Sequence, residues 1–402
     1  MPKKILIIIG ILLVIAMATG VFIFGFFIGA VFPTGDTPTI SLGASTRDMG
    51  VVNEVFDIVR DQYVDKESKR KLRDGAVDGL LKALDDPYTR RLKGEHFKIL
   101  EEQTNGRFSG VGIELSTEDG KLIVVTPIKN TPASKAGVRS KDLIVKIDGK
   151  TTEDMDIQEA VKLIRGEEGS KVTLTFVRDG GEPFDVEITR QEIKVPNVSG
   201  KIMEGDIGYI NILQFSESTG ADVDNELTSL KDKGAKGIII DLRSNPGGLL
   251  EEAVTVSSSF IKTGKPVVKI KPRKGKSEIK LSTGNSHDTK IPLVVLVDKG
   301  SASASEIVAG AIQDHGRGKI VGEKTFGKGS VQSVITLSDG SGLVITTAKY
   351  LTPDGRSLSH NGIEPDVVIE RDMEAHKTGV DNQLDLGITT LRKIMDSQKG
   401  KT

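Results

Sequence analysis

The sequence predicts a multidomain protein of mixed α/β and α+β class that follows an N-terminal transmembrane helix. Three observations support this prediction. An uncharged apolar run lies near the start, helical periodicity then gives way to short strands, and the second half of the chain alternates strands with helices. With 402 residues, the chain is long enough for two or three domains of about 150 residues each.

The composition excludes several kinds of function. The 55 basic and 56 acidic residues leave a formal net charge of −1, so the chain has no positive field that would bind a nucleic acid. It contains no cysteine, which excludes disulfides, thiolate nucleophiles and cysteine–zinc sites. Its 45 glycines exceed the usual share of about 7%, which directs the search for chemistry to glycine-rich turns.

Residues 5–32 form the predicted transmembrane helix. This run of 28 residues carries no charge, and a bilayer core requires about 20 apolar residues. Lys3 and Lys4 precede it, which predicts a cytoplasmic end over residues 1–4 and an extracytoplasmic location, at the cell membrane, for the rest of the chain. A cleaved signal peptide is the alternative, but its apolar region spans only about 7–15 residues. Residues 33–47 form a linker rich in Pro, Thr, Gly and Ser.

Residues 48–103 are predicted to form a packed N-terminal helical subdomain. Two sets of apolar residues recur with the helical period. They are Val52, Val55, Phe56, Val59 and Tyr63 in the first helix and Leu72, Ala76, Leu80 and Leu84 in the second. The segment Asp85-Asp86-Pro87 is expected to end the second helix.

Residues 104–190 change to short strands that glycine-containing turns separate, which predicts a small β-rich domain. The predicted strands are Val111–Leu115, Lys121–Thr126, Leu143–Ile147, Val172–Val177 and Phe184–Ile188. One helix is expected from about Ile157 to Arg165, with its apolar residues inward.

Residues 191–370 alternate strands with helices and form the predicted core of the protein. Its clearest strands are Lys236–Leu242, Leu293–Val297, Lys319–Gly322 and Val331–Leu337. Glycine- and serine-rich turns follow the first three, and ligand sites usually collect at the carboxyl ends of strands. Residues 371–402 contain an amphipathic helix that should pack on the core or on a second subunit. Its apolar residues are Leu384, Ile388, Leu391 and Met395.

Three serines are candidate nucleophiles in the turn after Leu293–Val297. Ser301, Ser303 and Ser305 lie where the strand passes into a helix, and at least one of them should cap that helix. A histidine base is poorly supported, because His315 follows on the same predicted helix and His360 lies in a polar loop. The residues alone do not choose among the three serines.

A lysine can replace histidine as the base in such a site. Its amine must then be neutral, which requires burial to lower its pKa by about three units. Lys328 lies between Gly327 and Gly329 and close to Phe326 and Val331, so the local sequence favours a suitable pocket.

Residues 104–190 resemble a PDZ domain in the permuted form found in bacterial proteases. The matching segments are Phe108–Ile113, Pro132–Gly137, Asp142–Ile144 and Ile147–Gly149. The resemblance implies that Gly110, Val111, Gly112 and Ile113 bind a peptide: successive backbone N–H groups converge on a terminal carboxylate, and the next strand pairs with the peptide. An ordinary strand-entry turn is the alternative.

The chain from about residue 48 to 370 resembles the carboxy-terminal processing proteases, also called tail-specific proteases. The motifs that carry this resemblance are Asp241–Gly248, Gly300–Ile307, Gly322–Gln332 and Gly362–Asp366. It implies a serine endopeptidase with a Clp-protease/crotonase-like core into which the PDZ domain is inserted. The expected substrates are proteins with free, apolar C-terminal tails, cleaved through an acyl-enzyme.

The resemblance assigns the catalytic roles. In this family the base follows the nucleophile by 25 positions, as Lys328 follows Ser303, and a glutamine four positions further on, here Gln332, orients the lysine. The rival base Lys324 would require a serine at the position that Lys299 occupies. The expected oxyanion hole consists of backbone N–H groups.

These N–H groups belong to Gly247 or Gly248 and to Ala304. The resemblance further suggests that Arg165 reports occupancy of the PDZ domain to the core, although a solvated cation at a helix end is an equal alternative. No metal or cofactor is expected, and family members often form homodimers through their helical ends.

Two other classes of function remain as alternatives. The first is a peptide-binding scaffold with an inactive protease core, although intact Ser303, Lys328 and Gln332 argue against it. The second is an acyl-CoA enzyme, because the core resembles the crotonase fold and its glycine oxyanion turns. A PDZ domain and an extracytoplasmic anchor do not suit CoA chemistry.

Overall fold

A computed structural model describes residues 49–118, 120–284, 288–372, 374–375 and 378–399. The chain divides into two compact units, one ending at Leu80 and the other beginning at Leu81. The predicted cytoplasmic end, transmembrane helix and linker lie outside the described residues. None of the helices in the described part of the chain has the length and apolar character that crossing a membrane requires.

The predicted N-terminal helices are confirmed, but their apolar residues are not buried. Helices α2 (Gly50–Gln62) and α3 (Lys69–Lys82) each contain no buried residue, and Val55 of α2 is 54% exposed. Within the part of the chain that the structure describes, these two helices thus show no buried face of the kind that the predicted packed subdomain would have. The structure also adds a short strand, β1 (Arg90–Leu92), and a third helix, α4 (Glu95–Asn105).

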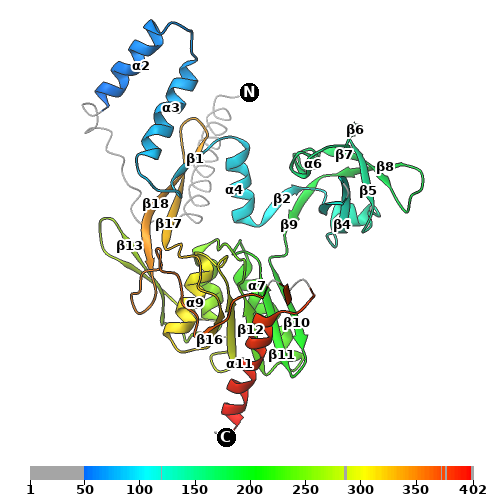
Figure 1. The fold of residues 1–402 in the computed structure, drawn as a ribbon, viewed down its shortest axis with the longest axis vertical. Coiled ribbons are helices and arrows are strands. Elements are labelled where there is room, and N and C mark those ends of the chain that lie inside the picture. Colours follow the sequence, from blue (N-terminus) through cyan, green and yellow to red (C-terminus); the bar gives the residue numbers. More distant parts are fainter. Residues whose placement is uncertain (1–48, 119, 285–287, 373, 376–377, 400–402) are drawn as a thin grey trace, which may run out of the picture. The chain divides into compact units, whose positions relative to one another are not determined.

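The β-rich domain contains an antiparallel sheet in the order β3-β4-β5-β7-β8, with β6 paired to β5 (Figure 1). Its strands are β3 (Ile113–Glu118), β4 (Lys121–Pro127), β5 (Leu143–Ile147), β6 (Lys150–Thr151), β7 (Lys171–Val177) and β8 (Phe184–Thr189). Helices α5 (Pro132–Lys135) and α6 (Ile157–Ile164) complete it. Alternate strand residues, among them Leu122, Val124 and Phe176, form its buried core. The predicted helix and strands are confirmed, except that the first strand begins at Ile113 instead of Val111 and extends to Glu118.

A two-stranded antiparallel ribbon carries the chain into and out of this domain. It pairs β2 (Arg107–Gly110) with β9 (Gln191–Lys194). Both connections therefore run through neighbouring strands, as expected for a domain inserted into another.

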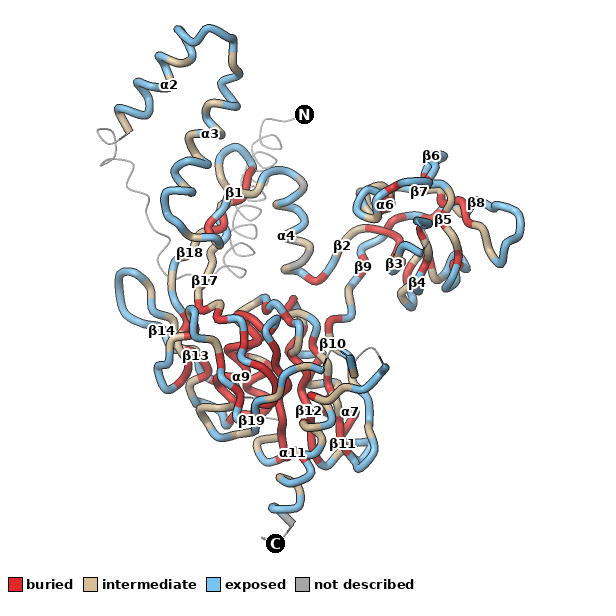
Figure 2. Tube along the Cα trace, viewed as in Figure 1, coloured by how far each residue is buried: buried red, intermediate tan, exposed pale blue. Residues whose placement is uncertain are grey.

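The core contains a six-stranded sheet in the order β10-β11-β12-β15-β16-β19. Its strands are β10 (Val198–Met203), β11 (Ile207–Ile212), β12 (Gly237–Asp241), β15 (Leu293–Val297), β16 (Lys319–Gly322) and β19 (Val367–Val368). All neighbours pair in parallel except β10, which is an antiparallel edge strand. Every residue of β12 and β15 is buried, because helices cover both faces of the sheet (Figure 2).

Alternate residues of these strands contact different helices. Ile238 and Ile240 pack with helices α7 (Thr219–Asp232), α8 (Leu250–Ser258) and α9 (Ala304–Asp314). Ile239 packs on the opposite face with Leu391 of helix α11 (Asn382–Lys399), which is fully buried. The prediction that the C-terminal amphipathic helix packs on the core is confirmed.

A second core sheet contains the hairpin that follows the lysine loop. It joins β1, β18 (Gly342–Leu351), β13 (Pro266–Pro272) and β14 (Glu278–Leu281), and β17 (Ser330–Thr336) pairs with β18. Because β17 begins two residues after Lys328, this hairpin positions the candidate base.

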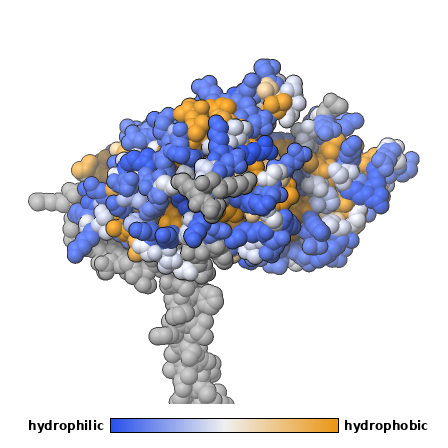
Figure 3. Space-filling model, turned by 90° about the horizontal axis from the view of Figure 1, so that it is seen from below, coloured by the Kyte–Doolittle hydropathy of each residue, from blue (hydrophilic) through white to orange (hydrophobic). Residues whose placement is uncertain are grey.

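The surface is mostly hydrophilic, and apolar residues form separate patches on the face that Figure 3 shows. One large apolar side chain is exposed close to a predicted site residue. Phe326 is 59% exposed although it lies two positions before Lys328.

Candidate active site

Three turns at the carboxyl ends of parallel strands form the candidate site. Residues 242–248 follow β12, residues 298–303 follow β15, and residues 323–329 follow β16. Because these three strands are neighbours in the sheet, their following turns meet at one edge. The sequence prediction that the chemistry lies at these turns is consistent with this arrangement.

Ser303 occupies an unusual backbone conformation at the start of α9. Its φ of 56° and ψ of −111° lie outside the regions that side-chain-bearing residues normally adopt, and the residue is only 8% exposed. Asn245 supports this turn, because its carbonyl oxygen accepts hydrogen bonds from the N–H of Ala302 and from Ser305 Oγ, both at 3.0 Å. A strained, buried serine that surrounding groups hold in place is typical of a functional site.

Two glycines of the neighbouring turn approach Ser303 closely. A Cβ atom on Gly247 would lie only 2.7 Å from Ser303 Cβ, so no larger residue fits there. The N–H of Gly247 already donates to Asn245 Oδ1 at 2.9 Å. In the described part of the chain, the N–H groups of Gly248 and Ala304 donate no hydrogen bond. Of the two glycines predicted for an oxyanion hole, Gly248 is therefore the one with an available donor.

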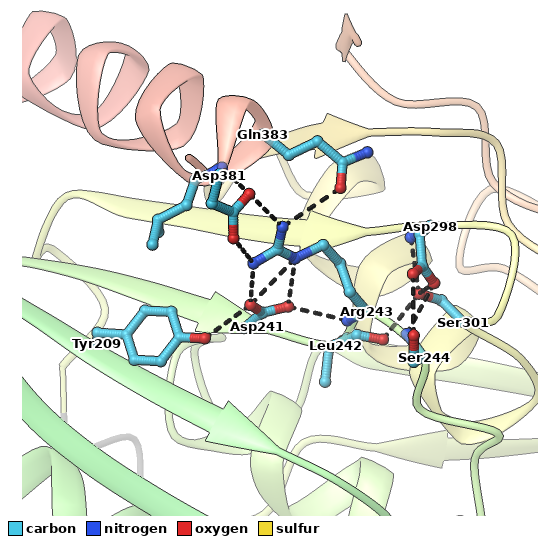
Figure 4. A network of polar contacts seen from close by, with 10 residues as sticks. Tyr209, Asp241, Leu242, Arg243, Ser244, Asp298, Ser301, Asp381 and Gln383 are labelled. Carbon is cyan, nitrogen blue, oxygen red and sulfur yellow. Dashed lines mark hydrogen bonds and ion pairs between the residues drawn. The ribbon is translucent and has the colours of Figure 1, made fainter. Parts of the chain in front are cut away.

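A buried ion-pair network fixes the start of this glycine turn (Figure 4). Arg243 donates through both terminal nitrogens to the Asp381 carboxylate, at 2.8 Å each, and through Nη2 to Asp241 Oδ2 at 2.6 Å. Although burial opposes the change, the hydrogen bonds from Arg243 lower the pKa of Asp381 below its ordinary value. The network thus joins the end of β12 to the segment that begins α11.

Asp298 connects the glycine turn to the serine turn (Figure 4). Its Oδ1 accepts the N–H of Ser244 at 2.7 Å, and its own N–H donates to Ser301 Oγ at 2.9 Å. Ser301 Oγ also donates to the carbonyl oxygen of Leu242 at 2.7 Å. The hydroxyl of Ser301 is therefore engaged in positioning the turns, which leaves Ser303 as the better nucleophile.

The backbone of the lysine loop is held on several sides. The carbonyl oxygen of Gly327 accepts the N–H of His360 at 2.9 Å, and that of Gly329 accepts the N–H of Tyr350 at 2.7 Å. A Cβ on Gly329 would lie 2.2 Å from Ser359 N, so the loop packs tightly against this neighbouring segment. The path of the chain through Lys328 is therefore well defined.

The side chain of Lys328 lies near Tyr88. Its Nζ lies 5.2 Å from the ring centroid of Tyr88, and within the described residues no hydrogen bond joins it to Ser303 Oγ. Burial lowers the pKa of Lys328, the charge of Arg90 lowers it further, and the charge of Glu306 opposes both effects. The lowered pKa agrees with the prediction of a lysine that can act as a base.

Gln332 lies on β17, and its amide is hydrogen-bonded to other residues of this hairpin. Its Nε2 donates to Ser330 Oγ at 2.7 Å and to Thr346 Oγ1 at 3.5 Å. The structure therefore brings Ser303, Gly247, Gly248 and Ala304 together, whereas the functional atoms of Lys328 and Gln332 remain unpaired with the serine.

The alternative bases are placed unfavourably. His315 caps the far end of α9, about 18 Å along the helix axis from Ser303, and its Nε2 contacts the carbonyl oxygen of Pro266 at 2.7 Å. Lys324 is exposed and lies 3.8 Å from the Glu364 carboxylate. Neither residue is a credible base for Ser303.

Sequence reasoning assigned no role to Glu306, which joins the serine turn to the lysine loop. Its Oε2 accepts the N–H of Ser303 at 2.8 Å and the N–H of Lys328 at 2.9 Å. The two backbone nitrogens are therefore no more than 5.7 Å apart, the sum of these distances. The spacing Ser303-x-x-Glu306 matches a helix capping box, a signal that could have identified this residue from the sequence.

The predicted peptide-binding segment of the β-rich domain has free backbone donors. The carbonyl oxygens of Val111 and Gly112 accept the N–H groups of Ala133 and Ile128, each at 2.9 Å, but within the described residues their own N–H groups donate no hydrogen bond. Gly112 has a φ of +80°, and a Cβ there would collide with Thr131. Strand β3, which begins at Ile113, is an edge strand and contacts α6.

Arg165 forms specific contacts at the end of α6. Its Nη1 donates to Glu102 Oε2 of α4 at 2.8 Å, and its Cζ lies 4.4 Å from the ring centroid of Phe108. A Cβ atom on Gly110 would lie 3.9 Å from Arg165 Cγ, so the arginine also lies beside the predicted peptide-binding segment. Arg165 is therefore not simply a solvated cation at a helix end, which was the alternative to a regulatory role.

Comparisons with known families match three parts of the chain. Residues 206–369 match Peptidase family S41, residues 123–178 match a PDZ domain, and residues 36–95 match the activating protease CtpB N-terminal domain. Within the described residues, no group of three His, Asp or Glu side chains is placed to bind a metal ion.

Two curated proteins resemble most of the chain. The carboxy-terminal processing protease CtpA of Bacillus subtilis is 40% identical over 342 residues, which cover 84% of this chain and 73% of that protein. A carboxy-terminal-processing protease of Bartonella bacilliformis is 39% identical over 381 residues, which cover 91% of this chain and 86% of that protein.

A solved structure shares the fold. It is from Bacteroides fragilis, is described as an S41 protease, and has a TM-score of 0.50 at 15% identity, covering 87% of this chain and 97% of that one. Together, the fold and the matches define a serine-type peptidase that carries a PDZ domain. The chain belongs to the carboxy-terminal processing proteases of peptidase family S41.

Proposed function

We propose that the protein is a membrane-anchored, extracytoplasmic endopeptidase that cleaves proteins selected by their C-terminal tails, with Ser303, Lys328 and Gln332 as its catalytic residues. One observation carries the catalytic part. A single carboxylate oxygen of Glu306 accepts the N–H groups of Ser303 and Lys328, so their backbone nitrogens lie within 5.7 Å. A lysine side chain is long enough to span this separation, so rotation about its own bonds would bring Nζ to the serine.

In the proposed reaction, neutral Lys328 removes the proton of Ser303 as Oγ attacks the substrate carbonyl carbon. The negative charge that develops on the carbonyl oxygen is stabilised by the N–H groups of Gly248 and Ala304. Lys328 then gives the proton to the leaving amine, and the C–N bond breaks to leave an acyl-enzyme. Water, activated by the same lysine, hydrolyses this ester and restores Ser303.

The role of Gln332 requires a local rearrangement. Its amide faces Ser330 and Thr346 on the hairpin, and Lys328 Nζ lies near Tyr88. We infer that, when substrate binds, the lysine turns from Tyr88 towards Ser303 and Gln332 accepts a hydrogen bond from the amine. This bond would fix the direction of the lysine lone pair.

The PDZ domain is proposed to bind the substrate tail. The free N–H groups of Val111 and Gly112 suit a terminal carboxylate, and the edge strand β3 suits pairing with an extended chain. Arg165 lies beside this segment and is bonded to Glu102, so it is the proposed route by which tail binding affects the rest of the chain.

The membrane anchor rests on the apolar run of residues 5–32 alone. Full-length protein should sediment with membranes after high-salt washing, whereas a chain that begins at residue 48 should remain in the supernatant. Release of the full-length chain by salt would contradict the anchor without affecting the catalytic assignment.

The function is tested with an unfolded reporter protein that ends in a free apolar tail. Full-length enzyme in detergent should cleave it, and Ser303→Ala should not. A reporter with an amidated tail should be cut more slowly, because each charge-assisted hydrogen bond to a carboxylate contributes about 1.5–3 kcal/mol. Equal cleavage by Ser303→Ala would refute the active site, and equal cleavage of acid and amide tails would refute carboxylate recognition.

A further inference from the structure

Glu306 is a fully buried carboxylate at the centre of the candidate site. It lies in the first turn of α9 and has no solvent exposure. Oε2 accepts the N–H groups of Ser303 and Lys328, as described above, and Oε1 accepts the N–H of Gly327 at 2.7 Å and the hydroxyl of Thr325 at 2.6 Å. One side chain therefore contacts both the serine turn and three residues of the lysine loop.

The hydrogen-bond pattern favours the ionised form of Glu306. Each carboxylate oxygen has two partners. Three of the four are backbone N–H groups, which can only donate, and the fourth is the hydroxyl of Thr325. A carboxylic acid could donate its proton only to the Thr325 hydroxyl and would be a poorer acceptor for the three N–H groups, so it fits this pattern less well. Burial raises the pKa of Glu306, but the four hydrogen bonds oppose that rise by stabilising the charged form.

We propose that Glu306 is a positioning residue that sets the spacing between the nucleophile and the base. This inference rests on the proposed function, in which Ser303 and Lys328 act together. The N–H of Ser303 belongs to a backbone with a φ of 56°, and its bond to Glu306 holds the residue in that conformation. The same carboxylate holds the loop from which Lys328 projects, so it fixes the backbones of the two reacting residues relative to each other.

The charge of Glu306 has a second consequence. Three groups face Lys328 in the structure: Arg90, whose charge lowers the pKa of the lysine, Glu306, whose charge raises it, and the ring of Tyr88. Removing the Glu306 charge should therefore lower the pKa of Lys328 further. A neutral residue that only held the two turns together would not produce this shift.

The test replaces Glu306 by glutamine in the full-length protein, with Glu323→Gln as the control. Glu323 is also buried and lies in the same loop, but its carboxylate contacts Lys299 and Gln383 and, within the described residues, forms no hydrogen bond with Ser303 or Lys328. Glutamine keeps the shape of Glu306 but turns an NH₂ group towards N–H donors. With the tailed reporter protein, kcat should fall by about 100-fold and KM should change little, since small misplacements of catalytic groups have such effects.

The pH dependence gives an independent readout. In Glu306→Gln, the midpoint at which kcat rises with pH should move to lower pH than in the wild type. Glu323→Gln should keep wild-type kcat and midpoint. A folded Glu306→Gln with near wild-type kcat, or with reduced kcat and an unchanged midpoint, would overturn the inference.

A second pair of variants decides the matter if Glu306→Gln does not fold. Thr325→Val removes one of the four donors, whereas Thr325→Ser keeps the hydroxyl. Thr325→Val should lower kcat by about tenfold, and Thr325→Ser should stay near the wild type. Equal kcat in the two variants would overturn the inference. Failure of the proposed function is recognised separately, because Ser303→Ala would then still cleave the reporter.

Discussion

The two reacting side chains of the proposed mechanism, Ser303 and Lys328, are held in different ways. Ser303 lies buried in a strained turn that Asn245 and Glu306 fix through the backbone. Lys328 also has a fixed backbone, but its Nζ lies 5.2 Å from the ring centroid of Tyr88 and, within the described residues, not in hydrogen-bond contact with Ser303. The nucleophile is thus preorganised, while the base still has to turn towards it.

This difference separates two requirements of catalysis. The oxyanion donors and the nucleophile must be rigid before substrate arrives, since reorganising them during the reaction would raise the barrier. The base can be engaged later, provided that its pKa is already low. Burial and Arg90 provide that condition for Lys328. If the lysine turns towards Ser303 only when substrate binds, the enzyme remains inactive until a substrate is present.

The largest effect should come from removing the base. Lys328→Arg keeps the positive charge but cannot lose a proton, so kcat should fall by about three orders of magnitude. Lys324→Arg is the matched control, because that lysine is exposed and lies near Glu364. Steady-state cleavage of the tailed reporter measures both. Near wild-type cleavage by Lys328→Arg together with loss in Lys324→Arg would reverse the assignment.

A smaller loss should follow from disturbing the rigid side of the site. In Gly247→Ala the new Cβ would lie 2.7 Å from Ser303 Cβ and 2.6 Å from the carbonyl oxygen of Ala302. The serine turn must then shift, and kcat should fall by about 100-fold, comparable to the loss of one oxyanion donor. Gly284→Ala is the control, because a Cβ there meets no atom within 4 Å. Full activity in Gly247→Ala would show that the turn is not rigid.

Removing the group proposed to orient the base should have a still smaller effect. Gln332→Ala leaves both the nucleophile and the base in place and removes one hydrogen bond, so kcat should fall by at most about tenfold. Ser333→Ala on the same strand should be neutral, because that hydroxyl contacts Thr347. A loss in Gln332→Ala as large as that in Lys328→Arg would mean that the lysine does not act as the base alone.

The smallest effect concerns pH. The lowered pKa of Lys328 means that kcat should rise with pH as the ammonium loses its proton, with a midpoint below that of an ordinary lysine. Arg90→Gln removes a repelling cation, which raises the pKa of Lys328 and moves the midpoint to higher pH. Arg107→Gln, on a residue that pairs with Glu192, should leave the midpoint unchanged. A shift to lower pH in Arg90→Gln would contradict the electrostatic account.

Regular features of the fold could be predicted from the sequence. The bounds of β5, β15 and β16 were predicted correctly, because each is a short run rich in branched apolar residues that turns enclose. Strand β1 was missed: it has only three residues, two of them arginines, and exists because it pairs with the distant strand β18. The exposure of α2 was also missed, since periodicity predicts an apolar face but not what covers it.

The roles of individual site residues were harder to predict from the sequence than the location of the site. The motifs indicated the correct turns, but they left Gly247 and Gly248 as alternatives, and only the bond from Gly247 to Asn245 distinguishes them. Glu306 was recognisable as part of a capping box, yet its contact with Lys328 spans 22 positions and depends on the packing of two turns. Such long-range contacts between side chain and backbone leave no periodic signal in a sequence.

The central claim, that Lys328 activates Ser303, is tested most directly by covalent labelling. Full-length enzyme is treated with a fluorophosphonate at a series of pH values, and the modified peptide is identified by mass spectrometry. The account predicts a phosphonyl adduct on Ser303 that forms faster as pH rises through the lowered pKa of Lys328, and that is nearly absent in Lys328→Arg. An adduct on Ser301 or Ser305, or equal labelling of Ser303 in Lys328→Arg, would contradict it.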